Sequence, residues 1–463
     1  MEAGKRTVLV GKRKVTVRLT RMNIYLYSKF IEAVDDHGTC YYFIYFKDEF
    51  ITVISASSLY RRSFIEKAWK HGTSFGPTHP FIHELVSSSH AYTLSQHLHT
   101  LKQKIEKHHS SQESSTIYTL LDGFFPKKDL FECIRELYYN HRRDGQLFAS
   151  YRILRVLTSF TPKHSWVKEN ANDLTFLSYK NLYAERNHTL WEKDPMFVEK
   201  TLYVTWRKQP ENVNKWIDLL QSERRWMDVA ALYIKNLTRT STERDYQQLR
   251  YLFTAHFPHL RLTSLLEDVM DRTPLTQVQT DLFELYLTSQ QWKKAIELMV
   301  NHQLTPSPHQ QEKIEQLFES LDRESLSSLS VEKLDTFILT LFSSRPGQAE
   351  KLLYTCVTHL MASYDLPYVY RWLASLNEAS PHTQKVRNML EWRENPDKQM
   401  RLGEMYYYFK QYHQAIDCFS WEMELHDTDP TPVRWLIKLY TETGREEESK
   451  LYQTYYKNMT MNT

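Results

Sequence analysis

The chain has 463 residues, of which 41% are hydrophobic and 25% charged, and its formal net charge is +3. This balance supplies enough apolar material for folded cores and excludes general disorder. No apolar run reaches the length of a membrane-spanning helix, and the N-terminal residues lack the apolar stretch of a signal peptide. Only 10 glycines are present, which disfavours glycine-rich loops that cradle nucleotide phosphates.

The first part of the chain has the alternating pattern of β-strands. Residues 7–10 and 14–20 flank the turn Gly11-Lys12-Arg13 and predict a hairpin. Residues 30–34 and 40–46 predict a second hairpin, and residues 50–54 a further strand. Ser57 or Ser58 is expected to cap a helix that runs to Trp69. We therefore expect a small antiparallel β-rich α+β domain with trailing helices over residues 1–109.

Basic residues are concentrated at the start of this region, where the first 30 residues hold eight Lys or Arg against Glu2 alone. Such a cluster protects an edge strand from pairing with other chains, or it contacts phosphate. We favour edge protection, because the overall pI near 8.4 lies below the value of about 9 expected of a dedicated nucleic-acid binder. For the second reading the candidate phosphate contacts are Lys12, Arg13, Lys14 and Arg18, and the candidate stacking residues are Tyr25, Tyr27, Tyr41 and Tyr42.

Histidine is concentrated in residues 71–109, which contain eight of the chain's 20 histidines. His79 and His83 have the i, i+4 spacing of a helical metal site, but Pro80 lies between them and Glu84 does not complete HExxH. No nearby cysteine or acidic ligand completes a tetrahedron. We expect exposed histidines on helix faces, no metal and no other cofactor.

Cysteine usage indicates the compartment. The four cysteines lie far apart and without CxxC spacing, at Cys40, Cys133, Cys356 and Cys418. Such spacing argues against both a disulfide framework and a thiolate zinc site. We expect a cytoplasmic protein.

Residues 110–116, with the sequence SSQESST, are polar and rich in serine. This composition predicts a linker, and we place the principal domain boundary there. From residue 117 onward apolar residues recur every three to four positions, which predicts helices.

The helical part contains repeats, and the clearest starts at Pro396. Its pattern is Leu402-Gly403-Glu404-Met405-Tyr406 followed by Tyr412, Ala415, Phe419 and Pro430. A shift of 34 residues reaches Leu436, Tyr440, Gly444 and Ser449. Weaker copies occur at Trp292, Ala295 and Met299 and at Trp226, Val229 and Tyr233. These patterns resemble the tetratricopeptide repeat (TPR) superfamily, well over residues 396–463 and less regularly over residues 117–395.

The resemblance implies a mainly α protein, in which a right-handed TPR-like α-solenoid follows the β-rich domain. Residues 117–395 would form degenerate repeats, and residues 396–463 the best-formed repeats and a C-terminal cap with a polar face. The first helix of each repeat would line a concave groove. Cations and aromatic rings there suit an acidic or amphipathic peptide, although Trp435 could equally be a packing residue. The candidate partner-binding residues are Arg401, Glu404, Tyr408, Arg434, Trp435 and Lys438.

Catalytic patterns are absent from the sequence: GxGxxG, GxxxxGK[ST], GxSxG and HExxH do not occur. We therefore expect a non-enzymatic protein-interaction scaffold or adaptor with a protein or peptide partner, no membrane association and no evident small-molecule substrate. The alternative is a nucleic-acid-associated protein, in which the basic N-terminal sheet contacts phosphate and the solenoid recruits a partner.

Overall fold

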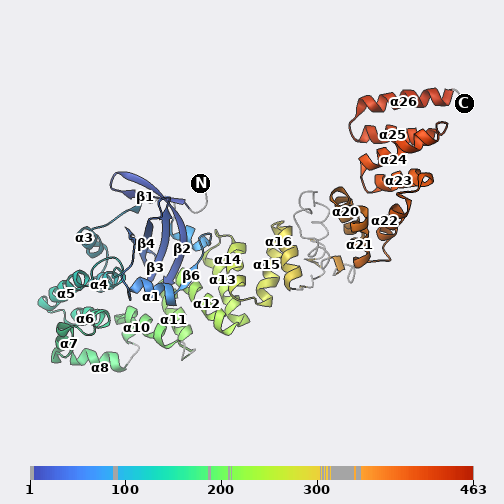
Figure 1. Ribbon diagram of the computed structural model, residues 1–463. Coiled ribbons are helices and arrows are strands. Elements are labelled where there is room, and N and C mark those ends of the chain that lie inside the picture. Colours follow the sequence, from blue (N-terminus) through green and yellow to red (C-terminus); the bar gives the residue numbers. More distant parts are fainter. Residues whose placement is uncertain are drawn as a thin grey trace. The chain divides into compact units, whose positions relative to one another are not determined.

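The computed structural model describes residues 5–86, 92–185, 189–206, 209, 211–302 and 346–461, together with positions 304, 307, 309–310, 313 and 338–339. It confirms a mainly helical chain with a β-rich N-terminal region (Figure 1). The chain forms two compact units, residues 1–278 and 279–463, and the division falls within helix α15 (Thr276–Thr288). In the part of the chain that the structure describes, no helix is both long and apolar enough to cross a membrane.

The first unit begins with a sheet that, among the described residues, has seven strands. Their order is β5-β4-β3-β2-β1-β7, and β6 pairs beside β2. All pairings are antiparallel except that of β1 with β7. Both predicted hairpins and the strand after them are therefore present. The bounds are β1 (Lys5–Val10), β2 (Arg13–Tyr25), β3 (Ser28–Asp35), β4 (Cys40–Phe46), β5 (Glu49–Ser55), β6 (Thr73–Phe75) and β7 (Tyr92–Thr93).

Alternating burial along β2 explains how the sequence specifies this sheet. Val17 and Leu19 are buried, whereas Arg18 between them is exposed, as the period of two in a strand requires. In the turn before β2, Gly11 has a φ of +62°, which glycine adopts at little cost. The helix predicted after the strands begins later than expected, at α1 (Phe64–His71), because Ser63 rather than Ser57 or Ser58 is its N-cap.

The serine-rich segment 110–116, predicted as a linker, instead begins helix α4 (Ser111–Leu120). Ser110 is the N-cap, and its side chain and that of Glu113 form a reciprocal capping box. Ser114, Ser115 and Thr116 are buried. The S-x-x-E pattern of a capping box was present in the sequence, and here it outweighs the linker-like composition.

Helices on the far side of the predicted boundary pack directly on the sheet (Figure 1). The rings of Phe124 and Tyr42 lie 5.3 Å apart between centroids, and the hydroxyl of Thr73 donates to the carbonyl of Ala231 at 3.3 Å. The sheet and the helices up to residue 278 thus belong to one compact unit, rather than to a separate domain of residues 1–109.

The described helices of the first unit alternate with short turns along the chain. Those not yet given are α2 (Pro80–Leu85), α3 (Leu98–His108), α5 (Lys127–Arg143), α6 (Leu147–Phe160), α7 (Ser165–Ala171), α8 (Leu177–Glu185), α9 (Thr189–Lys193), α10 (Pro195–Thr205), α11 (Glu211–Ser222), α12 (Trp226–Thr240), α13 (Glu243–His256) and α14 (Leu262–Arg272).

The second unit contains α16 (Trp292–His302), α20 (Pro346–Ser363), α21 (Leu366–Leu376), α22 (Pro381–Trp392), α23 (Gln399–Tyr408), α24 (Tyr412–Leu425), α25 (Pro430–Glu442) and α26 (Glu446–Met461). Helices α23 to α26 lie side by side in chain order (Figure 1). The last helix was expected to present a polar face, but its Leu451 is 68% exposed and its Tyr455 43% exposed.

Five of the described helix pairs are joined by the same turn. One residue of the turn has a positive φ, and the next N–H donates to the carbonyl five residues earlier at 2.8–3.0 Å. This is the Schellman arrangement, which satisfies carbonyls at a helix end. The second helices that begin at Trp226, Trp292 and Tyr412 are those whose repeat signatures were read from the sequence. The pairs are α5–α6, α11–α12, α15–α16, α23–α24 and α25–α26, with positive φ at Gly145, Arg224, Gln290, Lys410 and Gly444.

A small residue sets the separation of α23 and α24. A Cβ atom at Gly403 would lie 2.8 Å from the ring of Phe419, closer than real side chains approach. Phe419 belongs to a buried core cluster that also includes Ala415, Leu436 and Leu439. The glycine of the Leu-Gly-x-x-Tyr pattern is therefore required by the close approach of the two helices.

Replacing Gly403 by alanine should destabilise the second unit. Alanine favours the helix by about 1 kcal/mol, but overpacking costs about 1–3 kcal/mol, so we expect a net loss near 1 kcal/mol. Urea unfolding followed by tryptophan fluorescence measures the change. The matched control is Gly347→Ala in α20, where a Cβ meets nothing within 4 Å and no loss is expected. Equal stability of the two variants would contradict the steric argument.

Candidate functional site

Two of the predicted partner-binding residues, Trp435 and Lys438 of α25, meet Tyr407 of α23. The ring centroids of Tyr407 and Trp435 are 5.1 Å apart. The Nζ atom of Lys438 lies 4.4 Å from the centroid of Tyr407 and 4.9 Å from that of Trp435. We call Tyr407, Trp435 and Lys438 the Lys438 cluster. It presents one ammonium group on two aromatic rings.

Trp435 has a packing role as well. Its ring stacks on that of the buried Phe419, with 5.2 Å between centroids and an interplanar angle of 7°. Arg434, its neighbour, extends toward the last helix, where its Nε donates to the hydroxyl of Tyr456 at 2.7 Å. Arg434 is thus tied to α26 and does not join the Lys438 cluster.

The three predicted residues of α23 are placed differently. The ring of Tyr408 lies beside α20 and α22, 5.3 Å from Tyr354 and 3.6 Å from the Nζ atom of Lys385. Arg401 is exposed and Glu404 is half-buried. The structure therefore does not gather the six predicted residues into one site. Tyr407 was missed, because in a run of three tyrosines the sequence does not reveal which ring faces the next first helix.

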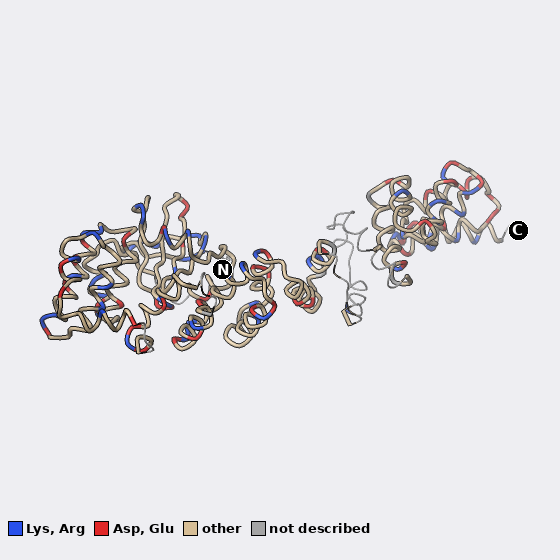
Figure 2. The backbone as a smooth tube through the Cα atoms, turned by 90° about the horizontal axis from the view of Figure 1, so that it is seen from below, with Lys and Arg blue, Asp and Glu red and all other residues tan. Residues whose placement is uncertain are grey.

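The four predicted phosphate contacts lie on the hairpin of β1 and β2, which we call the basic hairpin. All four are exposed, and none forms an ion pair with a described residue: Lys12, Arg13, Lys14 and Arg18. Basic and acidic positions are otherwise interspersed over the helices of both units (Figure 2). The expected stacking residues do not accompany the hairpin, since Tyr27, Tyr41 and Tyr42 are buried.

The histidine-rich segment is partly structural. His79 is buried, caps α2 and accepts the N–H of Phe81 through Nδ1 at 3.2 Å. Burial lowers the pKa of His79 to about 4, so its imidazole is neutral at physiological pH. His79 thus differs from the exposed histidines expected in this segment. Within the described ranges, no three His, Cys, Asp or Glu side chains gather as metal ligands.

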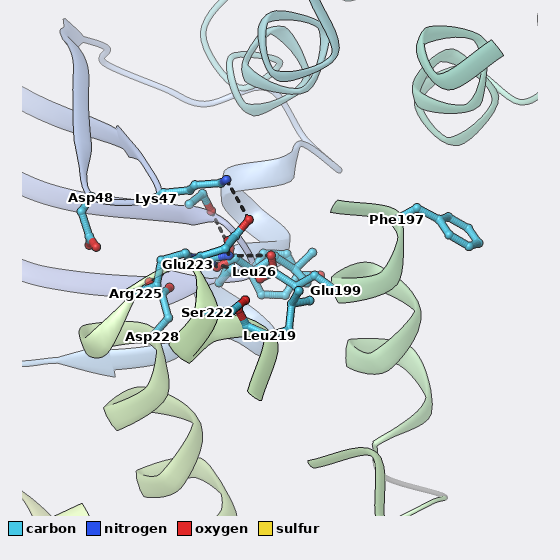
Figure 3. A network of polar contacts seen from close by, with 12 residues as sticks. Leu26, Lys47, Asp48, Phe197, Glu199, Leu219, Ser222, Glu223, Arg225 and Asp228 are labelled. Carbon is cyan, nitrogen blue, oxygen red and sulfur yellow. Dashed lines mark hydrogen bonds and ion pairs between the residues drawn. The ribbon is translucent and has the colours of Figure 1, made fainter. Parts of the chain in front are cut away.

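Four charged side chains that are almost completely buried form a network between the sheet and the helices (Figure 3). They are Lys29 of β3, Glu199 of α10, Arg225 at the N-cap of α12 and Asp228 in its first turn. Arg225 donates to both carboxylate oxygens of Glu199, at 2.6 and 3.1 Å. Lys29 Nζ donates to Asp228 Oδ2 at 2.6 Å. We call these four residues the buried charge network.

Backbone carbonyls complete the network. Arg225 Nη2 donates to the carbonyl of Leu26 at 3.0 Å, and Lys29 Nζ donates to the carbonyl of Lys47 at 2.7 Å. Leu26 and Lys47 lie in two hairpin turns and have φ values of +51° and +55°. A non-glycine residue in this conformation costs about 1–2 kcal/mol. Two acceptors of the buried charge network are therefore carbonyl groups of strained turns in the sheet.

The charges in the network are balanced. Burial lowers the pKa of Arg225, but Asp228 and Glu199 together raise it well above its ordinary value, so the guanidinium is charged. Burial raises the pKa of Glu199, and the guanidinium opposes that rise. Lys29 and Arg225 also pair with two less buried carboxylates, those of Asp48 at 2.9 Å and Glu223 at 3.0 Å. The two cations are therefore neutralised by the protein and need no ligand. We interpret the buried charge network as a structural contact that holds the sheet and the helices of the first unit together.

Removing the guanidinium should strongly destabilise the first unit. Arg225→Met leaves Glu199 buried beside an apolar side chain, and breaking a buried ion pair costs about 3–5 kcal/mol. Differential scanning calorimetry should show a lower transition temperature. The control is Arg135→Met, which removes an exposed pair with Glu132 and should cost less than about 1 kcal/mol. Similar effects of the two variants would show that the network does not hold the unit together.

Comparisons with known proteins give no family for this chain. No family model matches it, and no curated protein is similar to it. The resemblance to tetratricopeptide repeats stays a prediction from residues 396–463 and from the weaker copies upstream.

Proposed function

We propose that this protein is a non-enzymatic interaction scaffold or adaptor of the cytoplasm, and that the helix pairs of its second unit bind an acidic peptide or helix of a partner protein. The observation that carries the proposal is the Lys438 cluster. Its ammonium group is exposed and lies over two aromatic rings, and among the described residues it forms no ion pair with a carboxylate. A hydrogen bond with Tyr407 raises the pKa of Lys438, which keeps it charged.

The composition of this surface favours a partner of opposite charge. Arg401 on α23 is a second exposed cation without an ion pair to any described residue. Tyrosine, tryptophan and arginine are the residues most often responsible for binding energy at protein interfaces. Two acidic side chains of one peptide, one at Arg401 and the other at Lys438, would each gain a charge-assisted hydrogen bond, while apolar side chains of the peptide contact Tyr407 and Trp435.

We further propose that the helix pairs continue as a right-handed TPR-like α-solenoid, with its concave side formed by first helices. The shared Schellman turn supports this proposal. When successive helix pairs are joined by the same turn, their two helices are expected to meet at a similar angle. A small or β-branched buried residue also recurs five positions after the positive-φ residue, at Ser150, Val229, Ala295, Ala415 and Ser449. Stacked pairs of this kind expose a continuous binding surface.

The cysteines support the proposed compartment. Cys40, Cys133 and Cys418 are free thiols, and Cys133 and Cys418 are buried. Burial raises the pKa of Cys418 to about 12, so this thiol resists ionisation and disulfide exchange. Unpaired thiols are typical of a reducing environment.

Peptide binding to the full chain tests the scaffold proposal. Fluorescein-labelled amphipathic helical peptides of equal length, one acidic and one basic, are titrated with the protein while anisotropy is followed. The acidic peptide should bind, and Arg401→Glu combined with Lys438→Glu should weaken its binding about 30-fold. This estimate assumes that each lost contact to a charged group is worth about 1 kcal/mol.

The matched control is Lys450→Glu combined with Lys457→Glu. These two exposed residues of α26 give the same change in net charge outside the proposed surface. Retained binding in the first double variant, or equal loss in both, would contradict the assignment of the site. Preference for the basic peptide would contradict the proposed partner chemistry.

The basic hairpin favours a second candidate function, in which the first unit contacts nucleic-acid phosphate. Its support is the exposure of Lys12, Arg13, Lys14 and Arg18 without ion pairs to described residues. The burial of Tyr27, Tyr41 and Tyr42 argues for backbone contact rather than base stacking. We therefore rank this function second.

Salt dependence tests the second candidate. If the hairpin contacts phosphate, anisotropy of labelled DNA and RNA should show affinity that falls steeply with salt, and Lys12→Glu, Arg13→Glu and Lys14→Glu together should reduce the slope by about three. The control combines Lys163→Glu, Lys168→Glu and Lys450→Glu, which makes the same charge change elsewhere. A slope that does not respond to the hairpin variant would exclude this function.

A further inference from the structure

The first unit contains a cavity of about 800 Å³ between helices α1, α4, α5, α6, α8 and α10 and the turn from β2 to β3. A volume of this size is typical of small-molecule sites. Its lining combines aromatic rings with an unusual number of cations. The cations are Lys67, Lys127, Arg152, Arg155, Lys180 and Lys200. We call this space the basic cavity.

The protein offsets the cations of the basic cavity only in part: the charges of Lys127 and Lys67 act on Asp122 and oppose the rise in its pKa that burial causes. None of the six forms an ion pair with a carboxylate of the described residues. The lining contains two carboxylates, and both are already engaged. Asp122 accepts the N–H of Phe64 at 2.6 Å. Asp194 caps α10 and accepts from the hydroxyl of Tyr183 at 2.5 Å and from Gln112 Nε2 at 2.7 Å.

Arg155 is held in place by aromatic rings rather than by carboxylates. The carbon of its guanidinium lies 4.2 Å from the ring centroid of Tyr183 and 4.3 Å from that of Phe197. Its Nε is buried and has no hydrogen-bond partner among the described residues, and the same is true of the Nε atom of Arg152, one helical turn earlier on α6. Two guanidinium groups in the cavity wall therefore have donors to spare, and a planar guanidinium is well suited to phosphate.

The lowered pKa of Lys200 indicates that the cations of the basic cavity lie close enough to repel one another. Burial, and then the charges of Arg155 and Lys67, lower the pKa of Lys200. Like charges that lower one another's proton affinity repel in the empty cavity. A bound polyanion would remove this repulsion and gain contact with all three groups. This balance distinguishes the basic cavity from the buried charge network, where the charges cancel without a ligand.

The remaining walls are largely apolar. Tyr25, Tyr27 and Phe64 line one part of the cavity, and Tyr151, Phe160 and Phe197 also line it. Rings of this kind accommodate the planar or apolar body of a ligand. The combined lining fits a small molecule with an anionic head and an aromatic body better than it fits a free inorganic ion.

We propose that the basic cavity binds a small phosphorylated compound, with its phosphate at Lys67, Arg155 and Lys200 and its aromatic or apolar body against the tyrosine and phenylalanine side chains. This site lies wholly in the first unit and is independent of the peptide site proposed for the second. Binding needs no covalent step. The cavity would make the scaffold responsive to a metabolite of this class.

Calorimetric titration of the full chain tests the proposal with adenosine monophosphate, adenosine and inorganic phosphate as probes. Adenosine monophosphate should bind at least tenfold more tightly than either of the other two, because it supplies both the anion and the aromatic body. The bound nucleotide should also raise the thermal transition temperature of the first unit. Absence of binding by all three probes would overturn the proposal.

Lys200→Met provides the sharpest variant. It keeps the length of the side chain and removes one of the repelling charges, so the unliganded protein should melt at the same or a higher temperature while affinity for adenosine monophosphate falls at least tenfold. Lys67→Met, at an exposed position, should give the same loss of affinity without affecting the fold. Lys163→Met lies outside the cavity lining and should change neither quantity.

Unchanged affinity in both cavity variants would show that the nucleotide binds elsewhere and would overturn the proposal. A phosphoserine peptide is included as a competing probe. If that peptide binds while adenosine monophosphate does not, the site recognises a modified protein and the small-molecule proposal is wrong. The Arg401→Glu and Lys438→Glu variant should bind adenosine monophosphate normally, which separates this test from that of the peptide site.

Discussion

A buried charge must be neutralised where it is buried, and this constraint organises the first unit. Lys29 lies on a strand near the start of the chain, and its carboxylate partner Asp228 lies 199 residues further on. Arg225, from the same helix start, reaches Glu199 and a hairpin carbonyl of the sheet. Sequence-distant segments are thereby joined by contacts that tolerate little displacement, since any separation leaves an ion without water or a partner.

Elements with a local signal could be predicted from the sequence. Val17 and Leu19 alternate with Arg18, and this period of two predicted the strand. The starts of three second helices were marked by large aromatic residues, namely Trp226, Trp292 and Tyr412. Segment 110–116 shows that amino-acid composition alone does not distinguish a linker from the start of a buried helix. The pair Ser110 and Glu113 carried the capping signal, but the burial of Ser114 and Ser115 depends on helices that the local pattern does not describe.

The candidate sites were harder to predict because they depend on which side chains meet. Trp435 and Lys438 followed from the resemblance to tetratricopeptide repeats, which implies that first helices line the groove, whereas Tyr407 is recognisable only from its position beside the next first helix. The basic cavity was missed altogether. Its cations come from five helices between residues 67 and 200, and no spacing rule connects Lys67 with Arg155. The buried tyrosines failed as stacking candidates for a related reason, since alternation shows two faces of a strand but not that both are covered.

The positions of Lys29 and Asp228 also bear on how the chain can be divided. A fragment that ends at the serine-rich helix would keep every described strand of the sheet and the half-exposed Asp48 beside Lys29, but it would lose the buried Asp228. The carbonyl of Leu26, whose backbone is left-handed, would lose its donor Arg225, whereas the carbonyl of Lys47 would keep its donor Lys29. The sheet therefore has its full set of described polar contacts only when α12 is part of the same chain.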